Sequence, residues 1–390
     1  MNSNSNELRE FLEKAEKATD ELLGVEHTDE DESDDELEEK PYNPDDIRIY
    51  HKFFSVSDIC RWMSMEPPNI TVKPSFQRNQ VWNQRKKSLL IESLMLQIPV
   101  PSFYFYEDEG EHKSVIDGLQ RLSTIHDYVK GDFALSGLKY LGDKCNGKRY
   151  HELEHKYISR IEETQLSVNI LDSRTPEQVK YDVFTRVNTG GVPLNPQEIR
   201  NAMGHIKTTN LFRKMSTSDV FIEATRGRVK DTRMDAQELC LRFITFYRAY
   251  DKNGRIPRKD RPIAKMLDEC VIYLNSCDDR ALAKYYELFE SAMRKSIAAF
   301  GEHAFVKPEQ NIINRLLFTS WAVTLAYSSY SFEVLGKYQT ELVARLSKAI
   351  DADTDYFNAI TTSTASKRSI EKQFISAYEI LEDILSAHKS

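Results

Sequence analysis

The sequence predicts an α+β protein in which a small mixed unit of strands and helices precedes a mostly helical region. Two observations support this prediction. Stretches typical of strands, such as "IPVPSFYFYE" and "TQLSVNIL", are confined to the chain before Pro176. After Pro176, nearly every segment has its apolar residues at helical spacing, as in "DAQELCLRFITFYRAY". We therefore expect the first half of the chain to supply the whole sheet.

The composition is that of a globular protein. The chain has 390 residues, of which 40% are hydrophobic and 29% are charged, enough for one or two domains with a core. No apolar run approaches the roughly 18 residues that span a bilayer, and the first ten residues do not resemble a signal peptide. The five cysteines form no C-x-x-C pair, so we expect each to be a small buried residue in a reducing compartment. These features predict a soluble cytoplasmic protein without a membrane partner.

Acidic side chains are concentrated at the N-terminus. Residues 1–46 contain 18 acidic and 4 basic residues, whereas the remainder has a net charge of +6. Apolar residues between positions 6 and 23 share one face of a helix, and the run "HTDEDESDDELEEKPYNPDD" is typical of a disordered linker. We predict an acidic arm over 1–46. It is a solubilising tail, a tethered helix that binds a partner, or a segment that covers the protein's own basic groove.

The mixed unit is predicted over residues 47–205 and the helical domain over 206–390. In the mixed unit, "FSVSDICRWM" predicts a short helix capped by Ser55 or Ser57, and a longer helix is expected from about Asn83 to Leu96. "IPVPSFYFYE" and "HKSVID" predict a hairpin joined around "DEGE", and a helix follows from Leu119. The order of these elements places a polar turn directly between a strand and a helix.

That turn, "DGLQR", places Arg121 in the first turn of the helix. The N-terminus of a helix has unpaired N–H groups and a partial positive charge, so an arginine there is unfavourable by itself. One interpretation is helix capping alone, with Asp117 as the N-cap, Gln120 completing a capping box and Gly118 easing a tight corner. The other is a bound phosphate that accepts hydrogen bonds from the backbone and from the arginine. The residues leave both interpretations open.

A second polar stretch is "VFTRVNTGGVPLNPQEIRNA". Capping rules explain its glycines as helix terminators, and they explain "NPQE" as a capping box in which Asn195 is the N-cap and Glu198 its partner. The same rules leave Arg186, Arg200 and Asn201 unexplained. The turn is too long and too rich in proline for a DNA-reading helix-turn-helix.

Three basic runs, at 85–87, 226–233 and 251–265, hold most of the clustered positive charge. A single run of this kind is more typical of a solvated surface, but three of them on a body of net positive charge favour binding to DNA. The side chains expected at the nucleic-acid backbone are Arg226, Arg228, Lys230, Arg233, Arg255, Arg258, Lys259 and Arg261.

Taken together, the motifs resemble a known family. "PSFQRNQVW", "SLLIESLMLQIPVPSFYFYE", "VIDGLQRLSTIHDYV", "VFTRVNTGGVPLNPQEIRNA" and "RMDAQELCLRF" occur in the order found in the GmrSD-type restriction endonuclease N-terminal domain. That domain is similar to the ParB and sulfiredoxin fold. The resemblance covers roughly residues 47–250 and implies a ParB-like domain that processes nucleotides or DNA.

The resemblance also implies site residues and a cofactor. Asp117, Gln120 and Arg121 would be catalytic, and the cofactor would be a nucleoside triphosphate, with Mg²⁺. The nucleotide-binding residues would be Gln77, Arg78, Gly118, Asn188, Thr189, Gly190, Gly191, Asn195, Glu198 and Arg200. Leu119 departs from the family, which most often has glutamine there. The chain also lacks the histidine-based nuclease pattern of longer relatives, so cleavage would come from this domain or from a partner nuclease.

These expectations define two leading hypotheses. The first is a nucleotide-binding, NTP-hydrolysing, DNA-directed module of a restriction or anti-phage defence system, with the phosphates at the "DGLQR" turn. The second is a non-enzymatic ParB-like protein that binds DNA or recruits a partner under the control of a nucleotide. A structural interaction protein whose turn is only a helix cap is the remaining alternative.

Overall fold

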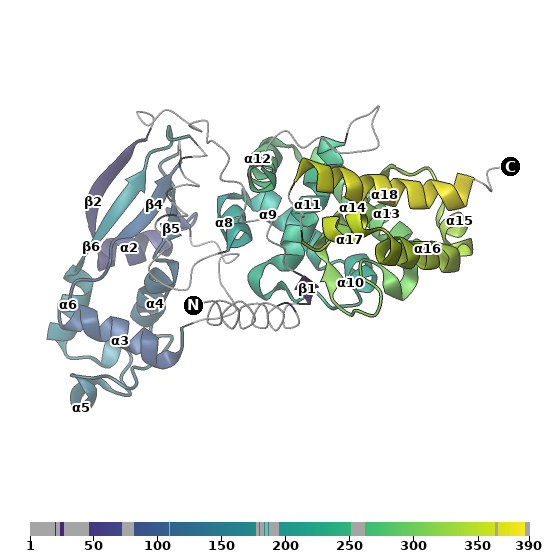
Figure 1. Ribbon diagram of the computed structural model, residues 1–390. Helices are drawn as coiled ribbons and strands as arrows, with labels where there is room; N and C mark the ends of the chain where they lie inside the picture. Colours follow the sequence, from purple (N-terminus) through teal and green to yellow (C-terminus); the bar gives the residue numbers. More distant parts are fainter. Residues whose placement is uncertain are drawn as a thin grey trace, which may run out of the picture. The chain divides into compact units, whose positions relative to one another are not determined.

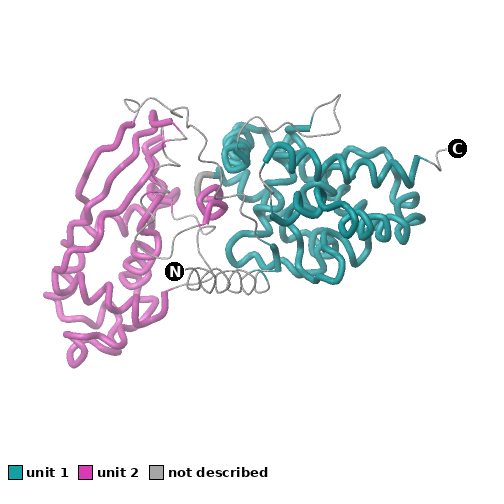
Figure 2. Tube along the Cα trace, viewed as in Figure 1, with its two compact units in different colours: residues 1–37, 204–390 teal, residues 38–203 magenta. Residues whose placement is uncertain are grey.

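The computed structural model describes residues 20, 24–26, 47–71, 82–108, 110–176, 179, 183, 186, 195–250, 262–362 and 366–386. The chain forms two compact units (Figure 2). Unit 1 combines residues 1–37 with residues 204–390, and unit 2 comprises residues 38–203. The chain thus starts in unit 1, forms unit 2, and then returns to complete unit 1.

Unit 2 contains a five-stranded mixed sheet. Its described elements, in chain order, are β2 (Ile49–Ser55), α2 (Val56–Met63), β3 (Ile70–Thr71), α3 (Gln84–Met95), β4 (Phe103–Glu107), β5 (Lys113–Asp117), α4 (Leu119–Lys130), α5 (Gly142–Cys145), a 3-10 helix at Tyr150–Glu152, α6 (His155–Glu163), β6 (Gln165–Leu171) and α8 (Pro196–Met203). The strand order is β2-β6-β4-β5-β3. β2–β6 and β4–β5 are antiparallel, whereas β4–β6 and β3–β5 are parallel.

Local signals position most of these elements. The Ser55 hydroxyl accepts a hydrogen bond from the Asp58 N–H at 3.0 Å, and the Asn83 side chain accepts one from the Lys86 N–H at 2.9 Å. The predicted hairpin is confirmed as β4 and β5, and the predicted helix from Leu119 is confirmed as α4. Strand β2 was not predicted, because most of its residues are exposed and its sequence does not alternate clearly between apolar and polar.

The two faces of the sheet pack differently. Phe103, Phe105, Leu166, Val168 and Ile170 are fully buried on one face, where α2, α3, α4 and α6 contribute to the same core (Figure 1). On the other face, Ile116 and Leu171 pack against Ile199 of α8, with Tyr104, Tyr106 and Val183 beside them. Strand alternation therefore places the aromatic pair Phe103 and Phe105 on the face that the helices cover.

A buried carboxylate holds a loop of unit 2 in place. Glu92 of α3 is 3% exposed, and its carboxylate accepts hydrogen bonds from the N–H groups of Lys139, Tyr140 and Leu141 at 3.0, 2.7 and 2.8 Å. Burial alone would raise the pKa of Glu92, but the three backbone N–H groups outweigh this effect and hold the pKa below its ordinary value. The charged form therefore stabilises the folded state.

Unit 1 is almost entirely helical. Its described elements are β1 (Val25–Glu26), α9 (Ile206–Ser216), α10 (Asp219–Thr225), a 3-10 helix at Asp231–Arg233, α11 (Asp235–Ala249), α12 (Ile263–Ser276), α13 (Asp279–Phe300), a 3-10 helix at Gly301–His303, β7 (Ile313–Asn314), α14 (Arg315–Tyr327), α15 (Phe332–Lys337), α16 (Gln339–Ala352), α17 (Thr354–Ala359) and α18 (Lys367–Leu385). The predicted α+β class, with a small sheet followed by a helical region, is confirmed. In the described ranges, none of the helices has the length and apolar character needed to cross a membrane.

Unit 1 also buries a charged cluster. The Arg242 Nε of α11 donates to the Glu238 carboxylate at 2.8 Å, and Arg315 at the start of α14 lies 3.3 Å from the same oxygen. All three side chains are less than 10% exposed. Because a buried arginine needs a compensating charge, this shared carboxylate ties α11 to α14.

The cysteines behave largely as small apolar residues. All five are free thiols, and four of them, Cys60, Cys145, Cys240 and Cys270, are buried. Cys277 is partly exposed. This burial agrees with the sequence prediction for four of the five positions.

We predict that Glu92→Gln lowers the free energy of unfolding by about 2–3 kcal/mol at neutral pH, because an amide cannot accept all three hydrogen bonds as a charged group. The wild-type advantage is fully present above the unfolded glutamate pKa of about 4.3 and falls as the pH drops through the lower folded pKa. Denaturant unfolding of both proteins between neutral and acidic pH measures this difference.

The control is Glu163→Gln, which alters an exposed glutamate at the end of α6. It should change stability by less than about 0.5 kcal/mol. An equal loss in both variants, or a Glu92→Gln deficit independent of pH, would contradict the assignment.

Candidate functional site

The "DGLQR" turn lies at the junction of β5 and α4. Asp117 is the last residue of β5, and Gly118 is the N-cap of α4 with φ 95° and ψ 10°. Helix α4 receives no side-chain cap hydrogen bond. The interpretation of Asp117 as N-cap of a capping box is therefore wrong, because Asp117 is still in the strand and its carboxylate is turned toward Arg121.

Arg121 is held by three protein acceptors. Arg121 Nη2 donates hydrogen bonds to Asp117 Oδ2 at 2.7 Å and to the Ser102 carbonyl oxygen at 3.2 Å. Arg121 Nη1 donates to the Pro101 carbonyl oxygen. The guanidinium carbon also lies 4.4 Å from the centre of the Phe103 ring. Burial lowers the pKa of Arg121, and the charge and hydrogen bond of Asp117 oppose this shift.

These contacts explain why an arginine is tolerated at this helix terminus. The side chain is only 13% exposed, and its charge is balanced by a carboxylate, two carbonyl dipoles and an aromatic face. We call the group formed by Asp117, Arg121, Phe103 and the carbonyls of Pro101 and Ser102 the arginine clamp. The clamp joins the end of β5, the start of α4 and the chain just before β4.

Gly118 is required by the same arrangement. Its φ of 95° lies in the left-handed region, and a Cβ built on it would lie 2.2 Å from Cδ1 of Phe103. The Phe103 ring is fully buried and cannot move aside easily. Glycine at this position therefore lets the ring pack beneath the turn.

A polar chain that the sequence did not predict reaches the clamp. His51 Nε2 on β2 lies 2.8 Å from Ser167 Oγ on β6, and Ser167 Oγ lies 2.9 Å from Ser102 Oγ. The Ser102 carbonyl is one of the acceptors of Arg121. The alternation of Leu166, Ser167 and Val168 already indicates a polar face of β6, but His51 lies on the strand that was not predicted.

The remaining predicted nucleotide-binding residues divide into two groups. The Asn195–Glu198 capping box is confirmed, because the Asn195 N–H donates to Glu198 Oε2 and the Glu198 N–H donates to Asn195 Oδ1, both at 2.7 Å. Glu198 and Arg200 are buried, with 3% and 1% exposure. Six predicted residues lie outside the described part of the chain: Gln77, Arg78, Asn188, Thr189, Gly190 and Gly191.

The predicted DNA-binding residues are only partly described. Arg226 is exposed and forms an ion pair with Glu302 at 3.2 Å, while Arg228 donates to Asn311 Oδ1 at 3.3 Å. Burial, and then the charge of Arg226, lower the pKa of Arg228. Lys230 is exposed. Arg233 is partly buried, and Arg255, Arg258, Lys259 and Arg261 lie outside the described residues.

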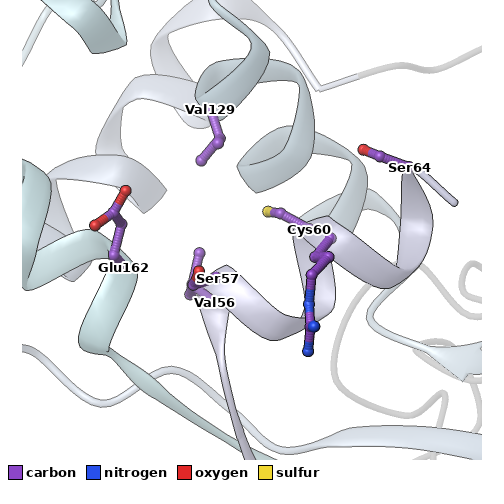
Figure 3. A pocket seen from close by; sticks show the side chains of 7 residues that line it. Val56, Ser57, Cys60, Ser64, Val129 and Glu162 are labelled. Atoms are coloured by element: carbon purple, nitrogen blue, oxygen red, sulfur yellow. The ribbon is translucent and has the colours of Figure 1, made fainter.

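Unit 2 also contains a small cavity, of about 260 Å³, that is lined by none of the predicted site residues (Figure 3). The residues that line it are Val56, Ser57, Cys60, Arg61, Ser64, Val129 and Glu162. Burial raises the pKa of Cys60 to about 12, so the thiol is protonated and a poor nucleophile. Glu162 accepts a hydrogen bond from the Tyr150 hydroxyl at 2.7 Å.

Neither this cavity nor the rest of the described chain supplies a metal cluster. Over residues 47–71, 82–108, 110–176 and the other described ranges, no group of three or more His, Cys, Asp or Glu side chains is placed to hold a metal ion. In the described parts of unit 2, the arginine clamp brings together the predicted site residues Asp117, Gly118 and Arg121, and the capping box brings together Asn195 and Glu198.

A five-stranded mixed sheet with a polar turn at the end of its hairpin defines unit 2 as an α+β domain with a charged strand–helix junction. Residues 57–204 match the family model described as "GmrSD restriction endonuclease, N-terminal domain". The predicted resemblance is therefore confirmed for residues 57–204, and this match is typical of a module of a restriction or defence system. The motif at 233–243 lies outside the matched residues. No curated protein and no solved structure gives a significant match to the chain.

We predict that Gly118→Ala lowers the free energy of unfolding by about 2–4 kcal/mol, because the new methyl group meets the buried Phe103 ring in addition to the cost of a positive φ. Gly147→Ala is the matched control. Gly147 has φ +78°, but no atom lies within 4 Å of the position that its Cβ would take, so only about 1 kcal/mol should be lost. Equal losses in the two variants, measured by denaturant unfolding, would contradict the role given to Phe103.

Proposed function

We propose that the "DGLQR" turn binds the phosphates of a nucleoside triphosphate within a DNA-directed module of a restriction or anti-phage defence system. The observation that carries this proposal is the set of donors on Arg121. A guanidinium has five N–H donors, and acceptors among the described residues engage three of them. Nε–H and the second Nη1–H remain, and because they point to different sides of the planar guanidinium, each could donate one hydrogen bond to a separate phosphate oxygen.

The start of α4 adds to this anion-binding potential. The N-cap Gly118 carries no side chain that could occupy the first N–H groups of the helix, and the helix dipole favours a negative charge at this end. The arginine is already oriented by Asp117 and by two backbone carbonyls. A phosphate would therefore meet a donor group that loses little conformational entropy on binding.

Asp117 fits a nucleotide that is bound together with Mg²⁺. Its side chain is 27% exposed, and only its Oδ2 atom is engaged by Arg121. Mg²⁺ on nucleotide phosphates is held by one or two carboxylates and several waters, and it would neutralise phosphate charge near Asp117. Oδ1 would be the oxygen that faces such an ion.

Hydrolysis is the next step of the proposal. Arg121 would stabilise negative charge that develops on the transferred phosphoryl group, and Gln120 next to it in the first turn would orient the attacking water. The family resemblance assigns Gln77, Arg78 and residues 188–191 to the same nucleotide site. Cleavage of DNA would come from this domain or from a partner nuclease.

A non-enzymatic nucleotide switch is the second candidate function. Leu119 supplies no polar group to the turn, and most of the hydrogen-bonding capacity of Arg121 is spent on the protein. A nucleotide that drew Arg121 away from Ser102 would alter the chain before β4 and the polar chain through Ser167. Binding would then change the shape of the domain without hydrolysis.

We predict that a nucleoside triphosphate with Mg²⁺ raises the melting temperature of the protein and that Arg121→Ala abolishes this shift. At a nucleotide concentration about 100 times Kd, the stabilisation would be about 2.7 kcal/mol. Each nucleotide is tested separately, and each shift is measured against the same variant without nucleotide, because Arg121→Ala also removes the clamp.

The matched control is Arg160→Ala, which removes another arginine of unit 2 that donates to a backbone carbonyl, that of Met95 at 3.1 Å. Its nucleotide shift should equal that of wild type. Steady phosphate release would favour the hydrolase, whereas a melting shift without release would favour the switch. A shift that survives Arg121→Ala would remove the turn from the proposed site.

We also predict salt-dependent binding to duplex DNA through the basic run at 226–233. Lys230→Ala should reduce the slope of log affinity against log salt concentration by about 1, because one phosphate contact is lost. Lys348→Ala, which removes an exposed lysine of α16 outside the basic runs, serves as the control. Equal slopes for wild type and Lys230→Ala, measured by titration at several salt concentrations, would place DNA binding elsewhere.

A further inference from the structure

Residues 24–26 of the N-terminal arm pair with the helical unit. Val25 and Glu26 form strand β1, which pairs in parallel with Ile313 and Asn314 of β7, and the Ile313 N–H donates to the Gly24 carbonyl at 3.1 Å. Ile313 also bridges Val306 on its other side. Residues more than 280 positions apart are thus joined as neighbouring strands. Figure 1 shows β1 among the helices of this unit.

The side chain of Glu26 is recognised by two buried groups. Lys307 Nζ lies 2.6 Å from Glu26 Oε1, and Asn314 Nδ2 donates to Glu26 Oε2 at 2.8 Å. Lys307 is 8% exposed and Asn314 is fully buried. Each carboxylate oxygen therefore has its own donor, which would distinguish an acid from a neutral side chain.

The Asn314 side chain is also held by hydrogen bonds within unit 1 that do not involve the arm. Its Nδ2 also donates to the Ile360 carbonyl at 2.9 Å, and its Oδ1 accepts from the N–H groups of Leu316 and Leu317 at 3.1 and 2.8 Å. The same side chain caps α14 and contacts the end of α17. Its geometry is therefore set by the core of unit 1, so little ordering is required when Glu26 binds.

The two residues before Glu26, Gly24 and Val25, fit unit 1 sterically. Val25 is fully buried and belongs to the main core of unit 1. Gly24 has φ +75°, and a Cβ built on it would lie 1.9 Å from the Arg228 carbonyl oxygen. Only a residue without a side chain fits this position, because the obstacle is backbone.

We propose that this part of unit 1 is a peptide-binding groove for a glycine–aliphatic–acidic tripeptide, in which the glycine has a positive φ and the next two residues form a strand, and that its occupant is the chain's own segment Gly24–Glu26. Backbone pairing supplies affinity. Specificity comes from three contacts: the Arg228 carbonyl that excludes a side chain at Gly24, the apolar core around Val25, and the Lys307 and Asn314 donors to Glu26. The segment 1–37 precedes unit 2 and the segment 204–390 follows it. The proposal does not depend on nucleotide or DNA binding.

The test is to cut the chain after the docked segment. A recognition sequence for a site-specific protease is inserted between Ser33 and Asp34 of the full chain, the folded protein is cleaved, and size-exclusion chromatography shows whether the N-terminal fragment remains bound. We expect it to remain bound to the rest of the chain. A synthetic peptide of residues 19–30, "TDELLGVEHTDE", should compete with it.

Three substitutions define the specificity. Gly24→Val and Glu26→Lys should each weaken retention of the fragment by about tenfold or more, and Glu26→Gln should weaken it less. Combining Glu26→Lys with Lys307→Glu should restore part of the binding. Glu30→Gln, which removes the same charge from the same arm, is the control and should behave as wild type.

Several outcomes would overturn the proposal. The proposal is contradicted if the wild-type fragment dissociates after cleavage, or if the peptide carrying Glu26→Lys competes as well as the native peptide. An uncleaved chain that runs as a dimer and dissociates with the competing peptide would show that the groove takes the segment of a second copy instead. Glu26→Gln, which alters charge with little change in volume, keeps the test informative if the other variants do not fold.

Discussion

One guanidinium fixes the junction from which the rest of the candidate site is built. Arg121 connects the last residue of β5 with the backbone just before β4, and it lies over a ring that belongs to the core beneath the sheet. The unfavourable dipole at a helix N-terminus amounts to about 0.3–1 kcal/mol, whereas a charge-assisted hydrogen bond contributes about 1.5–3 kcal/mol. The local carboxylate and carbonyls therefore outweigh the dipole, and an arginine becomes favourable where capping rules alone would avoid it.

This constraint changes what a ligand at the turn would encounter. A phosphate would bind to a guanidinium that is already oriented and already shared with Asp117, so part of its affinity would come from preorganisation and not from a new charge pair. The same sharing couples the ligand to the protein, because any movement of Arg121 alters its bonds to Ser102 and Pro101. The two proposed functions, nucleotide hydrolysis and nucleotide switching, would both make use of this coupling, and they would differ only in whether the charge stabilises a reaction.

Elements with local causes were predictable from the sequence. The caps at Ser55, Asn83 and Asn195 follow from side chains within three residues, and the β4–β5 hairpin follows from two strand patterns joined by a short polar loop. The mixed sheet was predictable as a class, but its strand order was not, because β2 is an exposed edge strand and β3 has only two residues. Pairing between distant strands leaves no periodic signal in either segment.

The candidate site shows the same limit at the level of single residues. "DGLQR" contains an acid and an amide at capping-box spacing, so the local rule assigns Asp117 to the cap. The observed cap is Gly118, because the rule takes no account of Phe103, which comes fifteen positions earlier and fills the space beneath the turn.

The N-terminal arm shows the corresponding limit for charge. Its 18 acidic residues look interchangeable when only net charge is counted, yet Glu26 has a lysine and a buried asparagine as specific partners. Bulk charge acts over a Debye length of about 8 Å at physiological salt and is indifferent to the order of residues, whereas a docked carboxylate depends on a glycine two positions before it. The arm therefore combines two physical properties, a sequence-specific attachment at residues 24–26 and a sequence-tolerant negative charge in the acidic residues on either side of it.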